Sequence, residues 1–332
     1  MVNNNQITLN KKASKIVQRS SFTRLKEVKD STEMIAILNG HNFFPKNEPL
    51  FRNYLEENGY YFTTGYRRPV LDSFSAKSWS GRYETGLSEN FFYEIAEFDK
   101  KLSILLLKYS NIIERRIKTR TAFFVSKQLS ESFYLDCQNF SSYERWVEFI
   151  NKIYLEVLRD GLKNNNPVIH HHILKYNQIL PAWALFEHLS FGQFIKLITN
   201  LNVQHKVNLL KDVYVSSKTH YDVKSYMSNA SAHRLLDAVC HIRNRIAHLG
   251  RIYDWKFVFL INSSLTIQSS FLSVVDLNKG YLNIVDIMEV FGLFIPKVEY
   301  IQMKSEYSIL LDRLSNSIQE PYYSRIKMLI CE

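Results

Sequence analysis

The stretch YEIAEFDKKLSILLLKYSNIIERRIKT, residues 93–119, decides the fold of this chain. Its apolar side chains recur at alternating steps of three and four residues, at Ile95, Phe98, Leu102, Leu105, Tyr109 and Ile112. That spacing places them on one face of an α-helix. The pattern predicts a long helix that begins near Asn90 and continues past Ile117 towards Val125.

The rest of the chain predicts further helices around this one. We expect them near residues 32–40 and 47–59, from Ser141 (with Glu144 in a capping box) to before Gly161, from Pro181, from about Ala232 to Leu249, and two across 283–330 around Pro296. The segment KFVFLI, residues 256–261, fits a strand or a helix equally well. A hydrophobic fraction of 46% with only 10 Gly and 7 Pro is typical of a packed globular protein. The expected fold class is therefore all-α.

Three segments of the chain differ in composition and in predicted secondary structure. Residues 1–30 are polar and basic, and we expect them to form an N-terminal arm. Residues 31–88 combine short helices with turns, and we expect an N-terminal helical extension packed on the core. Residues 89–332 hold the long helices and are expected to form the main helical domain.

The net charge indicates which partners the protein can attract, and the cysteines indicate its cellular compartment. Lys and Arg outnumber Asp and Glu by 42 to 32, a net charge of +10 that either attracts a polyanion such as nucleic acid or serves solubility. The three cysteines are far apart and show no metal or disulfide spacing, which suits a reducing cytoplasm. No apolar run reaches the roughly 20 residues of a membrane helix, and no secretory signal opens the chain. We therefore expect a cytoplasmic protein that does not enter a membrane.

The segment HRLLDAVCHIRNRIAHLGRIYD, residues 233–254, carries the candidate chemistry. On a helix its core face consists of Leu235, Leu236, Val239, Cys240, Ile242, Ile246 and Ala247. Asp237, His241, Asn244 and His248 fall within an arc of about 60° on another side. Because an imidazole exchanges its proton near neutral pH, this stripe is either a site for acid–base chemistry or an ordinary solvated face.

Arg243 lies near the middle of the apolar arc, about 140° from His248. A guanidinium in that position must be paired, because burying it alone is costly. It either pairs with a core carboxylate such as Glu97 or Asp99, or enters a cleft or a subunit interface from one flank. The sequence leaves both arrangements open.

Further basic and histidine residues offer weaker signals. Arg115, Arg116, Lys118 and Arg120 on the long helix, and Arg245 and Arg251 beside the candidate site, either form a solvated face or contact RNA phosphates, with Tyr253 and Trp255 available for base stacking. The consecutive His170, His171 and His172 cannot all face one metal ion on a helix. We therefore expect neither a metal site nor a cofactor.

Several stretches resemble known families. RNRIAH (243–248) is similar to the Arg-x(4–6)-His signature of the HEPN superfamily. The stretch 93–119, LPAWALFEHLSFGQFIKLITNL (180–201) and YLEENGYYFTTGYRRP (54–69) resemble, in the same order, segments of the Abi family of abortive-infection proteins, AbiD/AbiF type. Two positions depart from that family: Leu249 stands where a second His is frequent, and Ala96 replaces a Tyr.

The resemblance implies a HEPN-like helical bundle, a homodimer with two motifs meeting at the interface, and metal-independent RNA cleavage. In such cleavage the ribose 2′-OH attacks the adjacent phosphate. His248 would act as acid or base, Arg243 would stabilise charge on the phosphate, and Asn244 would orient His248 or a phosphate oxygen. Asp237, His241, Glu97 and Asp99 would support them.

The expected function is thus an endoribonuclease toxin of bacteriophage abortive infection, with RNA as the target and a structured small RNA as a further partner. The alternative is an RNA-binding protein of the same fold that does not cut. A DNA-binding or scaffold role draws only on the net charge, and nothing resembles a recognition helix suited to a major groove.

Overall fold

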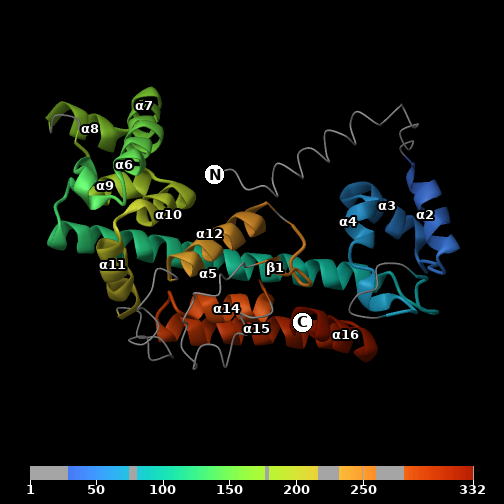
Figure 1. Cartoon of the computed structure of the whole chain (residues 1–332). Coiled ribbons are helices and arrows are strands. Elements are labelled where there is room, and N and C mark those ends of the chain that lie inside the picture. Colours follow the sequence, from blue (N-terminus) through green and yellow to red (C-terminus); the bar gives the residue numbers. More distant parts are fainter. Residues whose placement is uncertain are drawn as a thin grey trace, which may run out of the picture. The chain divides into compact units, whose positions relative to one another are not determined.

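A computed structural model describes residues 29–74, 81–175, 179–215, 232–248, 250–258 and 280–331 of the chain (Figure 1). Most of the expected basic arm, residues 1–30, lies outside the described residues. Most of the described residues are helical and very few are in strands, which confirms the all-α prediction. The named strands among them are β1 (Phe257–Val258) and β2 (Tyr281–Leu282), which pair antiparallel. The start of the ambiguous segment 256–261 is therefore a strand, and residues 259–261 lie outside the described part.

The chain forms two compact units. The first comprises Met1–Arg67, Leu71–Ser73 and Ser80–Glu89, and the second comprises Arg68–Val70, Phe74–Trp79 and Asn90–Glu332. The packing of residues 31–88 on the main domain stays a prediction.

The first unit contains short helices with their own core. These are α2 (Ser31–Gly40), α3 (Glu48–Asn58) and α4 (Tyr60–Thr64). Asp30 caps α2 in a reciprocal capping box with Glu33, and Asn47 caps α3. Phe43 and Phe51 are fully buried and meet edge to face at 5.3 Å. The two helices expected near 32–40 and 47–59 are thereby confirmed.

The second unit holds the long helices. In chain order its elements are η1 (Arg68–Val70), α5 (Asn90–Gln128), η2 (Phe133–Leu135), η3 (Cys137–Asn139), α6 (Tyr143–Phe149), the π-helical turn η4 (Ile150–Tyr154), α7 (Leu155–Lys163), α8 (Pro167–Lys175), α9 (Ala182–His188), α10 (Phe191–Asn200), α11 (Val203–Val215), α12 (Ala232–Ala247), α14 (Ile284–Gly292), α15 (Lys297–Ser317) and α16 (Glu320–Cys331).

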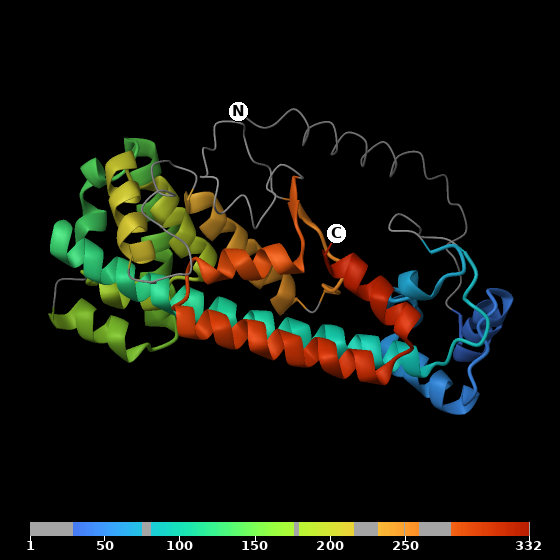
Figure 2. The same ribbon diagram turned by 90° about the horizontal axis from the view of Figure 1, so that it is seen from below.

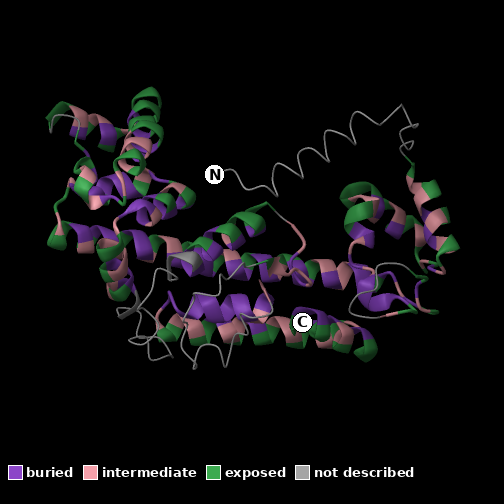
Figure 3. Cartoon of the chain, in the orientation of Figure 1, coloured by how far each residue is buried: buried purple, intermediate pink, exposed green. Residues whose placement is uncertain are grey.

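Helix α5 is the axis of this unit, and it begins at Asn90 and continues past Val125 as the sequence predicts. Helices α9, α11, α12, α14 and α15 all pack against it. Helix α15 lies alongside α5 in both views and runs antiparallel to it, because Asn90 contacts Ser317 whereas Lys108 pairs with Glu306 at 2.6 Å (Figures 1 and 2). Helix α14 is buried along almost its whole length (Figure 3). None of the described helices is both long enough and apolar enough to cross a membrane.

Several predicted helix boundaries are wrong. The helix expected from Ser141 begins at Tyr143, because Ser142 supplies the cap by accepting from Arg145 N. Gly161 does not end that helix. It lies inside α7, where a side chain would overlap Ile169 of α8, so glycine permits the close approach of the two helices.

Two longer predictions also need correction. The stretch after Pro181 forms two helices, because Ser190 and Gln193 make a reciprocal capping box that starts α10. The C-terminal stretch holds the three helices α14, α15 and α16 instead of two. The last break, between Ser317 and Glu320, carries neither glycine nor proline.

Candidate functional site

Helix α12 presents the predicted polar stripe on its solvent side. Asp237, His241, Asn244 and His248 are all exposed. Asp237 Oδ2 lies 3.6 Å from His241 Nε2, a contact between two side chains that are each more than half exposed. The helix ends at Ala247, yet the amide of His248 still donates to Asn244 O at 3.2 Å and so continues the helical spacing. The supporting role of Asp237 and His241 stays a prediction.

The opposite face of α12 is buried as expected, with one exception. Leu235, Leu236, Val239, Cys240, Ile242 and Ile246 are buried. Ala247 is exposed. Ala238, which is not part of the predicted core face, is buried. Burial raises the pKa of Cys240 to about 11, so its thiol stays neutral at physiological pH and is a poor nucleophile.

Arg243 is half-buried and held from two sides. Its Nη2 lies 3.7 Å from Glu114 Oε2 on α5, and its Nη1 donates to Asn244 Oδ1 at 3.1 Å. The expected pairing with Glu97 or Asp99 is therefore wrong. Helix α12 brings Arg243 to Glu114, about 22 Å further along the α5 axis than Asp99. About a third of the Arg243 side chain, 34%, remains accessible.

Glu114 also anchors Lys118, so the two cations share one carboxylate. Lys118 Nζ lies 2.9 Å from Glu114 Oε1 and donates to the Leu189 carbonyl at 2.6 Å. The Lys118 side chain is only 9% exposed. Lys118 is therefore not accessible to an RNA phosphate, and the prediction that it contacts RNA is wrong. Its role is to hold Glu114, which in turn holds Arg243.

Replacing Glu114 by glutamine should lower the free energy of unfolding by about 3 kcal/mol, because Lys118 and Arg243 lose their common counter-charge in a largely buried setting. Urea denaturation measures this. Glu97→Gln is the matched control, since Glu97 is 48% exposed, and it should cost less than about 1 kcal/mol. Equal costs for the two variants would show that Glu114 is not an anchor.

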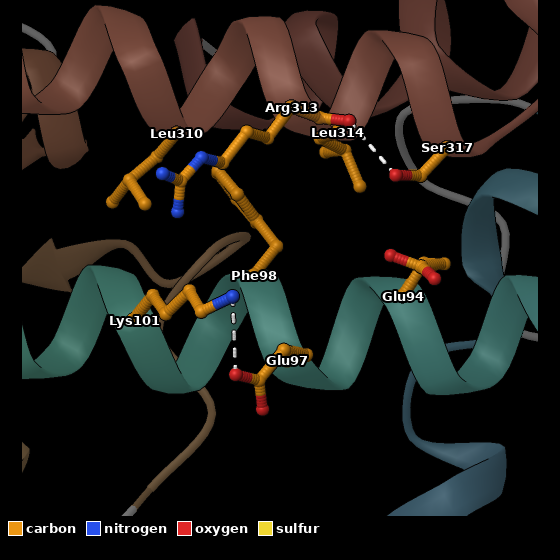
Figure 4. Close-up of a pocket in the computed structure, with 8 residues that line it drawn as sticks. All are labelled: Glu94, Glu97, Phe98, Lys101, Leu310, Arg313, Leu314 and Ser317. Carbon is orange, nitrogen blue, oxygen red and sulfur yellow. Dashed lines mark hydrogen bonds and ion pairs between the residues drawn. The ribbon is translucent and has the colours of Figure 1, made fainter.

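Glu97 lies in a different place from the candidate site. It borders a shallow pocket of about 30 Å³ between α5 and α15, where it pairs with Lys101 at 3.2 Å and its carboxylate points away from Arg313 of α15 (Figure 4). Along α5 it lies about 25 Å before Glu114. The prediction that Glu97 supports the site is therefore wrong.

Asp99 supports the chain that follows α12 and does not contact Arg243. Its buried carboxylate accepts from the backbone amides of Ile252 at 3.1 Å and Tyr253 at 2.7 Å. Asp254 adds contacts to Arg251 at 3.0 Å and to Arg68 at 4.0 Å. The Asp99 contacts fix the segment after the motif against α5, and the contact with Arg68 joins it to η1.

Replacing Asp99 by alanine should destabilise the protein by about 3 kcal/mol or more, because two buried amides lose a charged acceptor. Thermal and urea unfolding check the loss. Asp160→Ala, an exposed position on α7, is the matched control and should change stability by less than about 0.5 kcal/mol. A loss at position 99 no larger than at position 160 would refute this role.

The remaining predicted RNA contacts divide by exposure. Arg115 and Arg245 are exposed, and Arg245 lies over the Trp255 ring at 5.7 Å. Arg116 is half-buried, and its pKa is lowered first by burial and then by the charge of Arg120. Arg120 pairs with Asp212 of α11 at 3.2 Å. Arg251 is engaged by Asp254, as described above.

Burial decides whether Tyr253 can stack on a base, and it differs between neighbouring histidines of the run 170–172. Tyr253 is fully buried, and burial raises its pKa well above the usual value, so its proposed role in base stacking is wrong. His171 is exposed whereas His172 is buried, with its ring 5.7 Å from that of Trp183. The histidine run thus points in different directions.

The residue of the candidate site that is not predicted from the sequence is Glu114. It stands four residues before Lys118, a spacing that indicates an ion pair on one helix. Nothing in the sequence indicates that Arg243 of a distant helix joins that pair.

Fold and site together define an all-α protein in which α12 packs on the central helix α5. This helix presents an arginine that is held by a largely buried carboxylate and contacts exposed Asn244, and it carries the exposed His248 at its end. The model of the Abi-like protein family matches residues 53–254, more than half of the chain. The chain therefore belongs to the Abi-like protein family. No curated protein and no solved structure matches it significantly.

The matched region ends at Asp254 and so contains α5, α12 and the segment that Asp99 fixes. Helices α14 to α16 lie beyond it. Membership of this family associates the chain with abortive infection, a bacterial defence against bacteriophage.

Proposed function

We propose that this protein is a metal-independent endoribonuclease of the HEPN type that acts as a growth-arresting toxin in abortive infection. The observation that carries the proposal is the arrangement on α12, where Glu114 holds the Arg243 guanidinium and His248 is exposed at the helix end. A fixed guanidinium and a mobile proton carrier are what phosphodiester cleavage by an internal nucleophile requires.

In the proposed reaction the ribose 2′-oxygen attacks the adjacent phosphorus and loses its proton. The bond between phosphorus and the 5′-oxygen breaks, and that oxygen takes up a proton. The products are a 2′,3′-cyclic phosphate and a free 5′-OH. His248 exchanges the proton with one of these oxygens, Arg243 stabilises charge on the non-bridging oxygens, and Asn244 keeps the guanidinium oriented through its contact at 3.1 Å.

We further propose that the complete site forms in a homodimer. Arg243 and His248 are separated by about 140° around α12 and about 7.5 Å along it. That separation favours a site in which the arginine of one protomer meets the histidine of its partner. Such an arrangement uses one self-complementary surface twice, as twofold dimers do.

Expression of the chain in bacteria tests the proposed toxin activity. The wild-type chain should arrest growth and fragment cellular RNA, whereas His248→Ala should do neither at equal protein level. Growth arrest by both proteins without RNA fragmentation would contradict the proposal. It would favour the rival function, an RNA-binding protein that does not cut, which the departure at Leu249 also allows.

Arg115→Gln should weaken RNA binding and flatten its salt dependence, because Arg115 is exposed on α5 next to the anchored pair. The slope of log K against log salt should fall by about 0.7 for each lost phosphate contact on a single strand. Filter binding over a salt series measures it. Lys100→Gln, 68% exposed near the start of the same helix, is the control and should keep the wild-type slope. An unchanged slope for Arg115→Gln would remove that residue from the RNA surface.

A further inference from the structure

A groove of about 470 Å³ lies between the C-terminal half of α5 and helix α9. Lys118, Thr119, Ala122, Phe123 and Ser126 line it from α5. Trp183, Phe186 and Glu187 line it from α9, and Glu131 completes it. Its volume lies in the range of small-molecule sites, roughly 300–1,000 Å³.

The walls of this groove are aromatic and open to solvent. Phe123 is 65% exposed on one side of the groove, and Trp183 is 52% exposed on the other. Phe186 is buried beneath them. Two large exposed rings on facing elements form a surface that gains free energy when an apolar body covers it.

Two of the three charged side chains that line the groove are negative. Glu131 and Glu187 are exposed, and neither forms an ion pair within the part of the chain that the structure describes. The Glu131 carbonyl accepts from Ala182 N at 2.7 Å, which fixes Glu131 beside the start of α9. The one cation of the lining, Lys118, is engaged by Glu114 and the Leu189 carbonyl. An acidic, aromatic groove therefore occurs in a chain whose net charge is +10.

We propose that this groove binds a small organic cation with an aromatic or alkyl body. A cation over the faces of Trp and Phe is attracted by the ring quadrupole, and the two carboxylates supply opposite charge. An RNA phosphate is repelled by the same carboxylates, so we expect the groove to take the cation in preference to RNA.

Isothermal titration calorimetry with benzyltrimethylammonium chloride tests the proposal on the whole chain. Saturable binding is expected at concentrations up to about 10 mM. Sodium benzoate, which has the same ring and the opposite charge, should bind at least about tenfold more weakly. Because binding is measured directly, the result does not depend on whether the protein cuts RNA.

Variants separate the groove from other surfaces. Trp183→Ala and Glu187→Gln should each weaken binding by about tenfold. Trp183→Phe, which keeps an aromatic face, should retain most of the affinity and controls for loss of folding. Glu156→Gln, an exposed glutamate on α7 outside the lining, should leave the affinity unchanged.

Three outcomes would overturn the proposal. The first is no saturable binding of the cation to the wild-type chain. The second is equal or tighter binding of benzoate, which would assign the groove to an anion held by Lys118. The third is binding that Trp183→Ala and Glu187→Gln leave unchanged.

Discussion

Alanine at His248 is expected to lower the rate of RNA cleavage by about 10²–10⁴-fold, the usual contribution of a positioned general acid or base. His248 is exposed at the end of α12, so its removal takes away the proton carrier without disturbing the core. RNA affinity should stay within about threefold of wild type, because the exposed arginines that attract the backbone remain.

Single-turnover cleavage of a labelled RNA, together with filter binding of the same RNA, measures both quantities. His171→Ala is the matched control, since His171 is an exposed histidine on a different helix, α8, and its rate should equal that of the wild type. A His248→Ala variant that cleaves at the wild-type rate would remove this residue from the mechanism. A variant that loses affinity in proportion to rate would assign His248 to binding.

Alanine at Arg243 should lower cleavage by about 10²–10³-fold, as for removal of a group that stabilises the transition-state charge. Lysine at this position should restore little of the cleavage rate, because the guanidinium contacts Glu114 and Asn244 through two different nitrogens. The rate of Arg243→Lys therefore distinguishes a fixed guanidinium from a general positive charge.

Mixing the two inactive variants tests whether the site forms between protomers. If the arginine of one chain serves the histidine of its partner, each mixed dimer of Arg243→Ala and His248→Ala chains has one intact site. Random reassembly should then recover roughly a quarter of the wild-type activity. No recovery, in a mixture shown by light scattering to contain dimers, would place both residues of the site within one chain.

Periodicity alone predicts the two helices that carry the candidate site. The three-and-four spacing from Ile95 to Tyr109 matches a buried face of α5, and α12 buries the predicted arc except Ala247. Helix ends are predicted less well, because capping is decided by local hydrogen bonds. Ser142 caps where Ser141 is expected, and Gly161 packs inside a helix that it is expected to end.

The partners of the site could not be predicted, because they depend on where helices cross. Asp99 and Glu114 are both carboxylates on α5, and the sequence does not indicate which of them Arg243 meets. Asp99 accepts hydrogen bonds from backbone amides of the segment after α12. Lys118 is buried and forms an ion pair with Glu114. Tyr253 likewise reads as an accessible ring beside basic residues, whereas its segment folds into the core.

The most direct test of the central claim is the chemistry of the RNA ends that the purified protein produces in the presence of EDTA. We expect cleavage by the wild-type chain, with 2′,3′-cyclic phosphate and 5′-OH ends, and no cleavage by His248→Ala under the same conditions. Cleavage that requires added Mg²⁺ and leaves 5′-phosphate ends would contradict it, as would equal cleavage by the two proteins.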